Sequence, residues 1–338
     1  MKAIGLTTSL PIDDPRSLFE FETETPVPGP RDLLVRVRAV SVNPVDWKQR
    51  QRVAKGITLP EPRILGYDAS GVVEAVGPEV SLFRPGDPVF YAGSMQRQGS
   101  NAELHLVDER IVGRKPSSLS DAEAAALPLT SLTAWEAIFS RLRVPEGGGA
   151  GKALLIIGGA GGVGSIAIQL AKQLTRLEVI ATASRDESAR WCRDLGADAI
   201  ADHRDLVAAV RGPGRQHVDF ILCTNDFEGH WRSICELIAP QGAICSILGA
   251  RQLDDVGALM AKSATLAWEL MFTRSTFQTE DMGEQHQILN RVAELADAGR
   301  LRTTLTHTLT GFTAENHRRA HELVESGHMI GKLAIAYE

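Results

Sequence analysis

Residues 154–164, LLIIGGAGGVG, decide the fold. A short apolar run of the kind that forms a buried strand breaks into glycines, and from Val163 the apolar residues follow the spacing of one buried helix face. Gly159, Gly161 and Gly164 fall on the G-x-G-x-x-G register of a turn that binds a dinucleotide. The segment therefore predicts a strand, a glycine turn and a helix in the order that this motif requires.

The glycines of such a turn have separate roles. The first permits the tight turn, the second lets the backbone approach a pyrophosphate, and the third lets the helix pack closely on the strand. The anion lies at the helix N-terminus, where unpaired N–H groups and the helix dipole favour negative charge. A glycine-rich turn with a purely structural role is the alternative. The cofactor contacts predicted here are Gly159, Gly161, Gly162, Val163 and Gly164.

Length and composition indicate a globular protein of two domains. A chain of 338 residues exceeds one ordinary core, and 43% hydrophobic with 23% charged residues is typical of folded proteins. The net charge of −6 gives no reason to expect nucleic acid or an anionic membrane as a partner. The N-terminus shows no apolar signal core, and the four cysteines form no C-x-x-C pair. We expect a cytoplasmic protein with unbridged thiols and no membrane partner.

The first 128 residues are rich in strand signals. Val35 and Val37 alternate with two arginines, which is the period of a strand with one buried face. Frequent glycines and the PGD turn signal at 85–87 divide the following stretch into short strands. The pattern predicts a barrel-like, β-rich domain.

From residue 120 the spacing of the apolar residues becomes that of a helix. Ser120 is the predicted N-cap, and Glu123 is its capping-box partner. Beyond a flexible connector at 145–151, strands alternate with helical segments, which indicates an α/β fold with a parallel, doubly wound sheet. A further helix is predicted over 285–298, and 305–337 is predicted to form strand, helix and strand and to return to the first domain. The predicted strands of the parallel sheet are 153–157, 178–182, 198–201, 218–222, 243–248 and 266–271.

Four segments together resemble one enzyme superfamily. They are SVNPVDWK at 41–48, LGYDASGVV at 65–73, PLTSLTAW at 128–135 and the glycine turn. Over essentially its whole length the chain resembles the medium-chain dehydrogenase/reductase superfamily. It is most similar to the zinc-free, quinone-oxidoreductase-like branch, which includes proteins named zinc-type alcohol dehydrogenase-like. The resemblance implies a cofactor cleft between a GroES-like catalytic domain over 1–128, completed by 273–338, and a Rossmann domain over 129–272.

The chain departs from the zinc-dependent members of that superfamily at their metal ligands. Those members place a Cys at the position of Asn43, a His at that of Tyr67 and a second Cys near Leu129. A catalytic zinc needs three protein ligands of the Cys, His or carboxylate type, and Asp68 alone does not supply them. We therefore expect no zinc and no other metal.

The expected absence of a metal limits the kinds of substrate that can accept a hydride. Oxidation of an unactivated alcohol benefits from a Lewis acid, whereas a quinone or an α,β-unsaturated carbonyl already delocalises negative charge. We expect hydride transfer from a nicotinamide cofactor to such an acceptor, with the protein supplying position and modest polarisation. The rival hypotheses are an NADP(H)-binding redox sensor or interaction protein without efficient turnover, and a zinc-dependent alcohol dehydrogenase.

NADPH is the expected cofactor. NAD-specific Rossmann domains carry an acid at the end of the second strand, and ungapped counting places Ala183 there, followed by Ser184 and Arg185. A hydroxyl and a guanidinium suit a 2′-phosphate, to which Arg makes forked, charge-assisted contacts. The two acids that follow suit the start of the next helix. His203 takes the place where relatives often have an aromatic beside the adenosine phosphate, or is a surface residue after the third strand.

The resemblance implies catalytic roles for Asn43, Asp46 and Tyr67 near the nicotinamide; alternatively, Asn43 only caps a strand and starts a helix. Tyr67 can bind a substrate carbonyl or fill the volume of the missing His, and a phenol with a pKa of about 10 donates a proton but is a poor base. Lys48 is a rival donor or a solvated surface residue, and water is a further donor. Thr133 resembles the superfamily's threonine beside the nicotinamide carboxamide, or bonds back to a carbonyl within its helix.

Strand ends supply further predicted cofactor contacts, because doubly wound sheets bind ligands beyond the C-termini of their strands. A lysine of the C-terminal segment is also predicted to reach the cleft. These contacts are Thr224, Asn225, Ile247, Leu248 and Lys332.

Two other patterns have structural interpretations. His317 and His321 are four apart, a spacing that can bind metal, but two arginines intervene and a solvated helix face is expected. The stretch LAWELMF at 266–272 is unusually apolar for an edge strand, and relatives often pair this strand with its copy in a second subunit. We expect a homodimer formed through 266–272.

Overall fold

The computed structural model describes residues 1–212 and 214–337, which form two compact units. Unit 1 comprises Met1–Leu129 and Phe272–Glu338, and unit 2 comprises Thr130–Met271. The predicted boundaries, 128/129 and 272/273, each differ from these by one residue. The C-terminal segment lies in unit 1 with the N-terminal residues.

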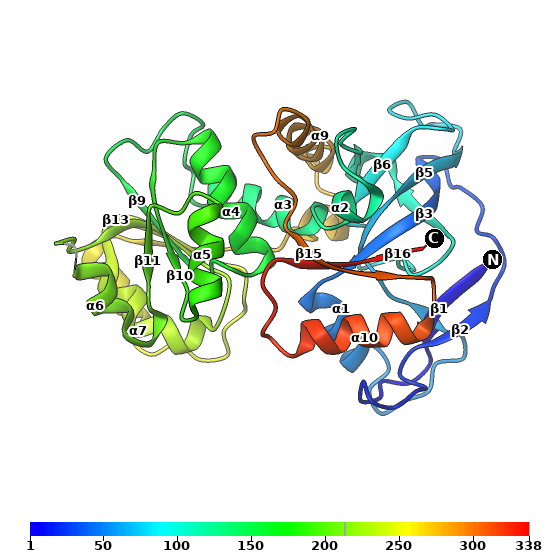
Figure 1. The fold of residues 1–338 in the computed structure, drawn as a ribbon, viewed down its shortest axis with the longest axis horizontal. Helices are drawn as coiled ribbons and strands as arrows, with labels where there is room; N and C mark the ends of the chain where they lie inside the picture. The colour runs from blue at the N-terminus through cyan, green and yellow to red at the C-terminus, as the bar shows by residue number, and fades with distance from the viewer. Residues whose placement is uncertain (213, 338) are drawn as a thin grey trace. The chain divides into compact units, whose positions relative to one another are not determined.

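Unit 2 is built on a parallel sheet with the strand order β11-β10-β9-β12-β13-β14. The order reverses at β9, the topological switch point beside which doubly wound sheets bind ligands. The predicted α/β, doubly wound fold is therefore confirmed (Figure 1). Its strands are β9 (Ala153–Ile157), β10 (Glu178–Thr182), β11 (Ala199–Ala201), β12 (Val218–Cys223), β13 (Ile238–Ser246) and β14 (Thr265–Trp268). Its helices are α4 (Gly162–Leu174), α5 (Asp186–Asp194), α6 (Leu206–Arg211) and α7 (Phe227–Leu237), with shorter segments η2 (Glu136–Arg141), η3 (His203–Asp205) and η4 (Val256–Lys262).

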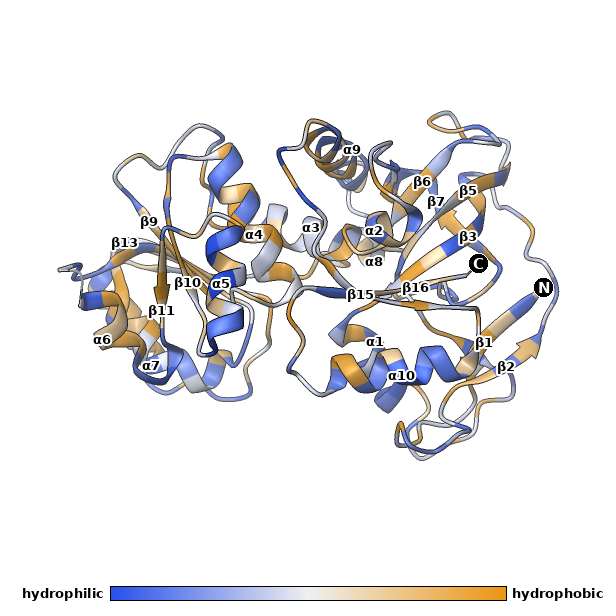
Figure 2. Ribbon diagram, in the orientation of Figure 1, coloured by the Kyte–Doolittle hydropathy of each residue, from blue (hydrophilic) through white to orange (hydrophobic). Residues whose placement is uncertain are grey.

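The central strand β9 is buried on both faces, which explains its uninterrupted apolar sequence. Leu155 and Ile157 share a hydrophobic cluster with Phe227 and Trp231 of α7, and the alternate residues of the strand face the opposite side. Figure 1 shows α4 and α5 on one side of the sheet and α6 and α7 on the other. Figure 2 shows the strands as mostly hydrophobic and α5 as mostly hydrophilic.

Three predictions for unit 2 differ clearly from the structure, and one concerns β13, which covers Ile238–Ser246 where 243–248 was predicted. The connector at 145–151 lies inside unit 2, where the N–H of Gly147 donates to Leu174 O and that of Arg176 to Gly148 O, both at 2.7 Å. It is tied to the end of α4 rather than linking two domains. The edge strand β14 ends at Trp268, three residues earlier than predicted.

Unit 1 is β-rich, as predicted. Its largest sheet has the order β15-β16-β3-β5-β6-β8 with β7 also paired to β3, and a second sheet has the order β2-β1-β4. Its strands are β1 (Lys2–Leu6), β2 (Phe19–Glu22), β3 (Asp32–Val42), β4 (Arg63–Ile64), β5 (Asp68–Val76), β6 (Pro88–Tyr91), β7 (Leu104–Asp108), β8 (Val112–Arg114), β15 (Leu305–Thr310) and β16 (Lys332–Ala336). Its helices are α1 (Pro44–Arg52), α2 (Asp121–Ala125), α8 (Thr273–Phe277), α9 (Glu284–Asp297) and α10 (Ala314–Glu325), with the short segment η1 (Glu109–Ile111), and α3 (Pro128–Trp135) spans the boundary between the units.

The pairing of β16 with β3 joins the two ends of the chain. These strands are antiparallel, with Leu333 opposite Val42 and Ile335 opposite Val40. All four side chains belong to the main hydrophobic cluster of unit 1. The pairing brings the start of β16 next to the end of β3, where the polar site described below begins.

The predicted capping box is present at the start of α2. The N–H of Ser120 donates to Glu123 Oε2 at 2.9 Å, and the N–H of Glu123 donates to Ser120 Oγ at 3.3 Å. The helical region predicted from this point is interrupted, because α2 ends at Ala125 and α3 begins at Pro128, which has no N–H to continue the first helix.

The expectation of a solvated face for His317 and His321 is wrong, because both side chains are fully buried on α10. His317 Nδ1 lies 2.8 Å from Thr313 O and its Nε2 lies 3.3 Å from Tyr337 Oη. Burial lowers the pKa of His317 to about 4 and that of His321 to about 3. The intervening arginines occupy the other face, since residues four apart share one side of a helix.

The four cysteines all lie in unit 2 and none is bridged. Cys192, Cys223 and Cys245 are buried, and burial raises the pKa of each of these thiols to about 12. Within the described part of the chain, no helix combines the length and apolarity needed to cross a membrane.

Candidate active site

The glycine turn joins β9 to α4 in unit 2, and its backbone geometry explains most of its glycines. Gly158, immediately before the motif, has φ +88°, and its N–H donates to Thr182 Oγ1 at 2.9 Å. The left-handed residue of the turn is therefore Gly158 and not Gly159. A Cβ on Gly159 would lie 2.7 Å from Ala181 Cβ, and one on Gly164 would lie 2.3 Å from Gly158 O. Both positions require glycine for packing.

Gly161 is different, because the protein itself leaves room for a side chain there. A Cβ on Gly161 would meet only Gly158 O, at 3.6 Å, which is an ordinary contact. Gly161 is the N-cap of α4, so Gly162 and Val163 begin the helix and carry N–H groups without intrahelical acceptors. A 13-residue helix with an uncrowded, side-chain-free N-terminus can hold an anionic group such as a pyrophosphate.

The other predicted cofactor residues of unit 2 lie where the sequence placed them, after strand C-termini. Ser184 and Arg185 follow β10 and are exposed, and His203 opens η3 after β11 with its ring 6.1 Å from that of His230. Thr224 and Asn225 follow β12 beside the turn, where Thr224 Oγ1 donates to Ile157 O at 2.8 Å.

Two more positions complete the predicted set in this unit. Ile247 and Leu248 follow β13 and are half-buried. Thr133 lies within α3 and is 5% exposed.

In unit 1, Asn43 and Asp46 stand at the junction of β3 and α1. Asn43 is the N-cap and Pro44 the first residue of α1, whose fixed φ suits that position. The backbone N–H of Asn43 donates to Asp46 Oδ2 at 2.7 Å. The Asn43 amide does not cap the helix: its Nδ2 donates to Asp68 Oδ2 at 2.8 Å. Asn43 is therefore both the N-cap residue of α1 and a hydrogen-bond partner of Asp68.

The contacts of Lys332 were the hardest to predict from the sequence. It is 5% exposed, and its Nζ donates to Asn43 Oδ1 at 2.7 Å and to Val42 O at 2.8 Å, 3.6 Å from Asp68 Oδ2. Asp68 also accepts from the N–H of Leu129 at 2.7 Å. The described structure thus brings Lys332 together with Asn43 within unit 1, a contact between residues 289 positions apart.

Burial sets the ionisation of this group, defined here as the polar cluster of Asn43, Asp46, Asp68 and Lys332. Burial raises the pKa of Asp46 to about 7 and also raises that of Asp68, whereas it lowers the pKa of Lys332. The positive charge of Lys332 opposes the shift at both acids, and their negative charges oppose the shift at Lys332. A carboxyl that titrates near neutral pH suits acid–base chemistry.

Tyr67 precedes β5, and its ring packs against that of Phe272 with centroids 4.9 Å apart. It is 5% exposed, and burial, followed by the charge of Asp46, raises the pKa of its phenol far above the ordinary value. Lys48 lies on α1 with Nζ 5.6 Å from the centre of the Trp47 ring, and partial burial lowers its pKa. Tyr67 therefore stays protonated at neutral pH and can donate a hydrogen bond.

A metal does not suit these residues. Among the described residues, no three side chains of the His, Cys, Asp or Glu type converge as metal ligands. The positions named above for zinc hold an amide and a phenol, and the carboxylate of Asp68 already accepts from Asn43 and Leu129. A buried ammonium 3.6 Å from that carboxylate would also repel a cation.

Sequence reasoning missed a second buried charge cluster, in unit 2. Glu136 and Glu269 are 0% and 2% exposed; Arg141 Nε lies 2.7 Å from Glu269 Oε2, and Arg141 Nη2 lies 3.7 Å from Glu136 Oε2. Burial, and then the charge of Glu136, raises the pKa of Glu269 to about 8. The sequence signal that could have indicated this cluster is Glu269, the single acid within the apolar stretch 266–272.

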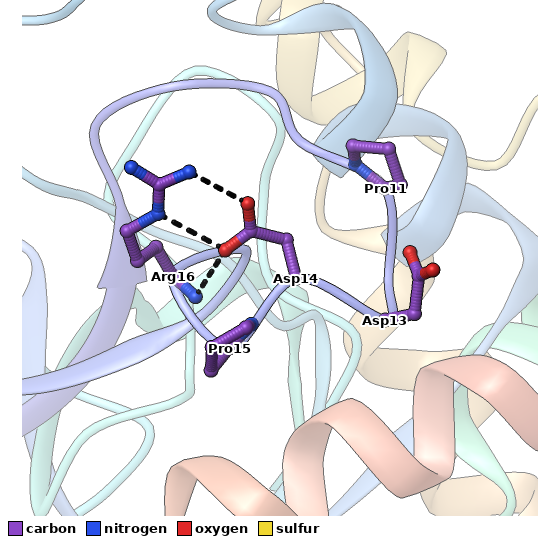
Figure 3. A pocket seen from close by; sticks show the side chains of 5 residues that line it. All are labelled: Pro11, Asp13, Asp14, Pro15 and Arg16. Atoms are coloured by element: carbon purple, nitrogen blue, oxygen red, sulfur yellow. Dashed lines mark hydrogen bonds and ion pairs between the residues drawn. The ribbon is translucent and has the colours of Figure 1, made fainter.

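A surface hollow in unit 1 is lined by loop residues outside the polar cluster (Figure 3). Asp14 there accepts from Arg16, at 3.1 Å from Nε and 2.8 Å from Nη2, so its carboxylate is already paired. The remaining lining residues are Pro11, Asp13 and Pro15, which offer no convergent ligand set. The hollow is not part of the candidate site.

Comparison with known proteins agrees with this architecture. Residues 29–117 match the alcohol dehydrogenase GroES-like domain family, and residues 195–335 match the zinc-binding dehydrogenase family. A zinc-type alcohol dehydrogenase-like protein of Staphylococcus aureus is 43% identical over 338 residues, which is 99% of this chain and 99% of that protein. The chain belongs to the medium-chain dehydrogenase/reductase superfamily. The resemblance and the GroES-like and Rossmann assignments are thereby confirmed, and the protein is an oxidoreductase of the superfamily's type.

Solved structures of the superfamily share the fold. A Rhizobium etli protein named as a zinc-dependent alcohol dehydrogenase is 52% identical with a TM-score of 0.94, covering 100% of this chain and 98% of its own. The quinone oxidoreductase of Coxiella burnetii is 28% identical with a TM-score of 0.82, covering 100% and 99%. That of Escherichia coli, solved with NADPH, shows the fold at 22% identity, a TM-score of 0.81 and coverage of 99% and 100%. The 2-methylene-furan-3-one reductase of Solanum lycopersicum is 37% identical over 213 residues, which is 60% of this chain and 52% of that enzyme.

Proposed function

We propose that this protein is a metal-free, NADPH-dependent oxidoreductase that transfers hydride to a quinone or an α,β-unsaturated carbonyl. The observation that carries the proposal is Gly161, a glycine at the N-terminus of α4 that the protein's own packing does not require. A ligand that approaches the backbone closely explains that glycine, and a pyrophosphate is the ligand that this turn binds in dinucleotide-binding proteins.

The residues after β10 support NADPH rather than NADH. Ser184 and Arg185 offer a hydroxyl and a guanidinium on the surface, and no acid stands at Ala183. With His203 they form the proposed site for the 2′-phosphate. The further cofactor contacts proposed are Thr133, Thr224, Asn225, Ile247, Leu248 and the residues of the glycine turn.

The donor set of the polar cluster supports chemistry without a metal. The names of several relatives include zinc, yet an amide, a phenol and a leucine stand at the corresponding positions of this chain, and the neighbouring carboxylate of Asp68 is already paired. The acceptor classes come from relatives whose names are quinone oxidoreductase and 2-methylene-furan-3-one reductase, an enone reductase. NADPH, when bound, supplies the hydride; Asn43, Asp46 and Tyr67 are proposed to position the acceptor and to handle its proton.

We also propose a cytoplasmic homodimer formed through the edge strand β14 and the residues after it, 266–272. Trp268 and Leu270 are 51% and 55% exposed, which is unusual for side chains of this size. Pairing of the edge strand with its copy would bury both side chains and satisfy the open backbone groups of β14.

Steady-state turnover with a panel of quinones and enones tests the proposed reaction. We expect NADPH to be consumed with at least one of these acceptors, and elemental analysis to find no stoichiometric zinc. Tight NADPH binding without consumption would instead favour the redox-sensor hypothesis. Stoichiometric zinc would favour an alcohol dehydrogenase.

Fluorescence titration with NADPH and NADH tests the cofactor assignment. Arg185→Ala should weaken NADPH binding by about 1–3 kcal/mol, the cost of losing a charged hydrogen-bond partner, and leave NADH nearly unchanged. Arg190→Ala, an exposed arginine on the same helix, is the matched control and should change neither. Equal losses for both cofactors in Arg185→Ala contradict a phosphate-reading role.

A further inference from the structure

The polar cluster of unit 1 contains two acids and one base, all buried. Asp46 is 1% exposed, Asp68 0% and Lys332 5%. A buried charge is stable only where an opposite charge and hydrogen bonds compensate for lost water. One ammonium can therefore balance one carboxylate, and the other carboxyl group is stable as the neutral acid.

The contacts decide which acid is ionised. Asp68 has three donors around its two oxygens: Asn43 Nδ2 at 2.8 Å, the N–H of Leu129 at 2.7 Å and the ammonium of Lys332 at 3.6 Å. Asp46 accepts from the backbone N–H of Asn43 at 2.7 Å, and it forms no ion pair with the described residues. The cluster therefore stabilises the negative charge on Asp68.

The orientation of the Asn43 amide agrees with this assignment. Lys332 Nζ has no acceptor capacity, so the atom that it contacts at 2.7 Å must be the amide oxygen. The amide nitrogen then points to Asp68 and donates to its Oδ2, while the N–H of Leu129 donates to Oδ1. Acceptance at both oxygens suits the ionised form, because a carboxylate accepts hydrogen bonds and has no proton to donate. Lys332 thus directs both its own charge and the Asn43 donor toward Asp68.

We infer that Asp46 is a neutral carboxylic acid in the resting protein and gives the proton that completes the reaction, with Lys332 as the positioning residue that keeps the negative charge on Asp68. This inference rests on the proposed function. Burial, followed by the charge of Asp46, raises the pKa of the Tyr67 phenol, which remains protonated. A pKa of about 7 for Asp46 suits proton donation at neutral pH far better than the raised pKa of that phenol.

The step balances in atoms and electrons. Hydride brings two electrons to the electron-poor carbon, and a π pair moves onto the acceptor's oxygen, which leaves an anion. The O–H bond of Asp46 breaks, its proton bonds to that anion, and the electron pair of the broken bond remains on Asp46 as a carboxylate. Water then returns a proton to Asp46. The acceptor is reduced by two electrons, and the proton transfer changes no oxidation state.

Infrared spectroscopy of the protein without cofactor or substrate tests the protonation state independently of activity. A protonated carboxyl gives a C=O stretching band that a carboxylate lacks. We expect a wild-type minus Asp46→Asn difference spectrum to contain this band at pH 6 and to lose it above pH 8. Asp13→Asn, which removes an exposed acid of unit 1, is the control and should show no such band. A difference spectrum without the band at pH 6 overturns the inference even if the enzyme turns over.

The pH dependence of kcat tests the roles of the neighbours. Asp46→Asn should lower kcat about a hundredfold, within the usual range for loss of a general acid, while the NADPH dissociation constant stays unchanged. Lys332→Met should move the alkaline limb of kcat to higher pH, because a positive neighbour is lost. Asp68→Asn should move it to lower pH, because Lys332 then pairs with Asp46. Lys55→Met, an exposed lysine, is the control for charge removal.

The two variants must shift the alkaline limb in opposite directions, which a general loss of structure does not produce. Shifts in the same direction, or a kcat profile in Asp46→Asn that keeps the wild-type limb, overturn the assignment. Circular dichroism confirms folding, and Lys332→Gln replaces Lys332→Met if the latter unfolds, since it keeps a donor for Asn43 without the charge. Absence of turnover in the wild type with an intact infrared band would refute the proposed function but not the protonation of Asp46.

Discussion

Two glycines of the same turn, Gly161 and Gly164, are expected to respond oppositely to the same substitution. In Gly164→Ala the new Cβ would lie 2.3 Å from Gly158 O and 2.7 Å from Gly159 O, so the backbone must move. Overpacking of this kind costs about 1–3 kcal/mol, and contact with two backbone carbonyls argues for the upper end. The higher helix propensity of alanine relative to glycine offsets at most about 1 kcal/mol of this cost. We expect a net loss of about 2 kcal/mol in the free energy of unfolding.

Gly161→Ala should leave stability nearly unchanged. Its Cβ would meet only Gly158 O at 3.6 Å, and its φ of −72° is accessible to alanine. The weaker N-cap costs about 0.5–1 kcal/mol, and the stiffer unfolded chain offsets about 0.4–1 kcal/mol. If a pyrophosphate lies against this backbone, however, the added methyl group occupies its space. We expect NADPH affinity to fall at least tenfold, which is about 1.4 kcal/mol.

Urea unfolding followed by tryptophan fluorescence measures the first effect, because four of the five tryptophans lie in unit 2. NADPH titration measures the second. Wild-type stability in Gly164→Ala would refute the packing argument. Wild-type NADPH affinity in Gly161→Ala would refute the placement of the pyrophosphate, and with it the observation that carries the proposed function.

Other predictions concern stability and assembly. Ser120→Ala should lower the free energy of unfolding by about 0.5–2 kcal/mol through loss of the capping box with Glu123, measured by urea unfolding against the wild type. His321 is neutral in the folded state, with its pKa lowered to about 3 against 6.5 unfolded, so its contribution is present above pH 6.5 and is lost as pH falls. The stability of His321→Leu relative to the wild type should therefore rise by about 2 kcal/mol between pH 7 and pH 5, at 1.4 kcal/mol per pH unit, and a pH-independent difference would contradict the buried, neutral state. Leu270→Lys should dissociate the proposed dimer in sedimentation velocity without lowering the thermal midpoint of unit 2, whereas an unchanged sedimentation coefficient would place the interface elsewhere.

Much of unit 2 was predictable from the sequence because its signals are local. Strands β9 and β10 have the predicted bounds, since buried parallel strands are continuous apolar runs ended by glycine or polar residues. The capping box of α2 was predictable for the same reason: it depends on residues three apart. The positive φ of Gly158 was not predicted, because the spacing of the motif does not show which of the adjacent glycines, Gly158 or Gly159, is left-handed.

The polar cluster could not be predicted in full, because it depends on pairing between distant strands. Lys332 reaches Asn43 only through the register of β16 on β3, and no spacing in the sequence records that register. The burial of His317 and His321 was predictable in principle. Ala314 and Val324 share their face at helical intervals, and the polar neighbours obscured this apolar stripe.

The buried cysteines have a consequence for an enzyme that handles quinones or enones. Such compounds are Michael acceptors that alkylate thiolates, and a thiol with a pKa of about 12 is almost never a thiolate at neutral pH. Cys192, Cys223 and Cys245 are therefore protected from covalent attack by the proposed substrates, both by inaccessibility and by protonation. At these three positions the fold therefore limits alkylation by the reactive compounds that the protein is proposed to reduce.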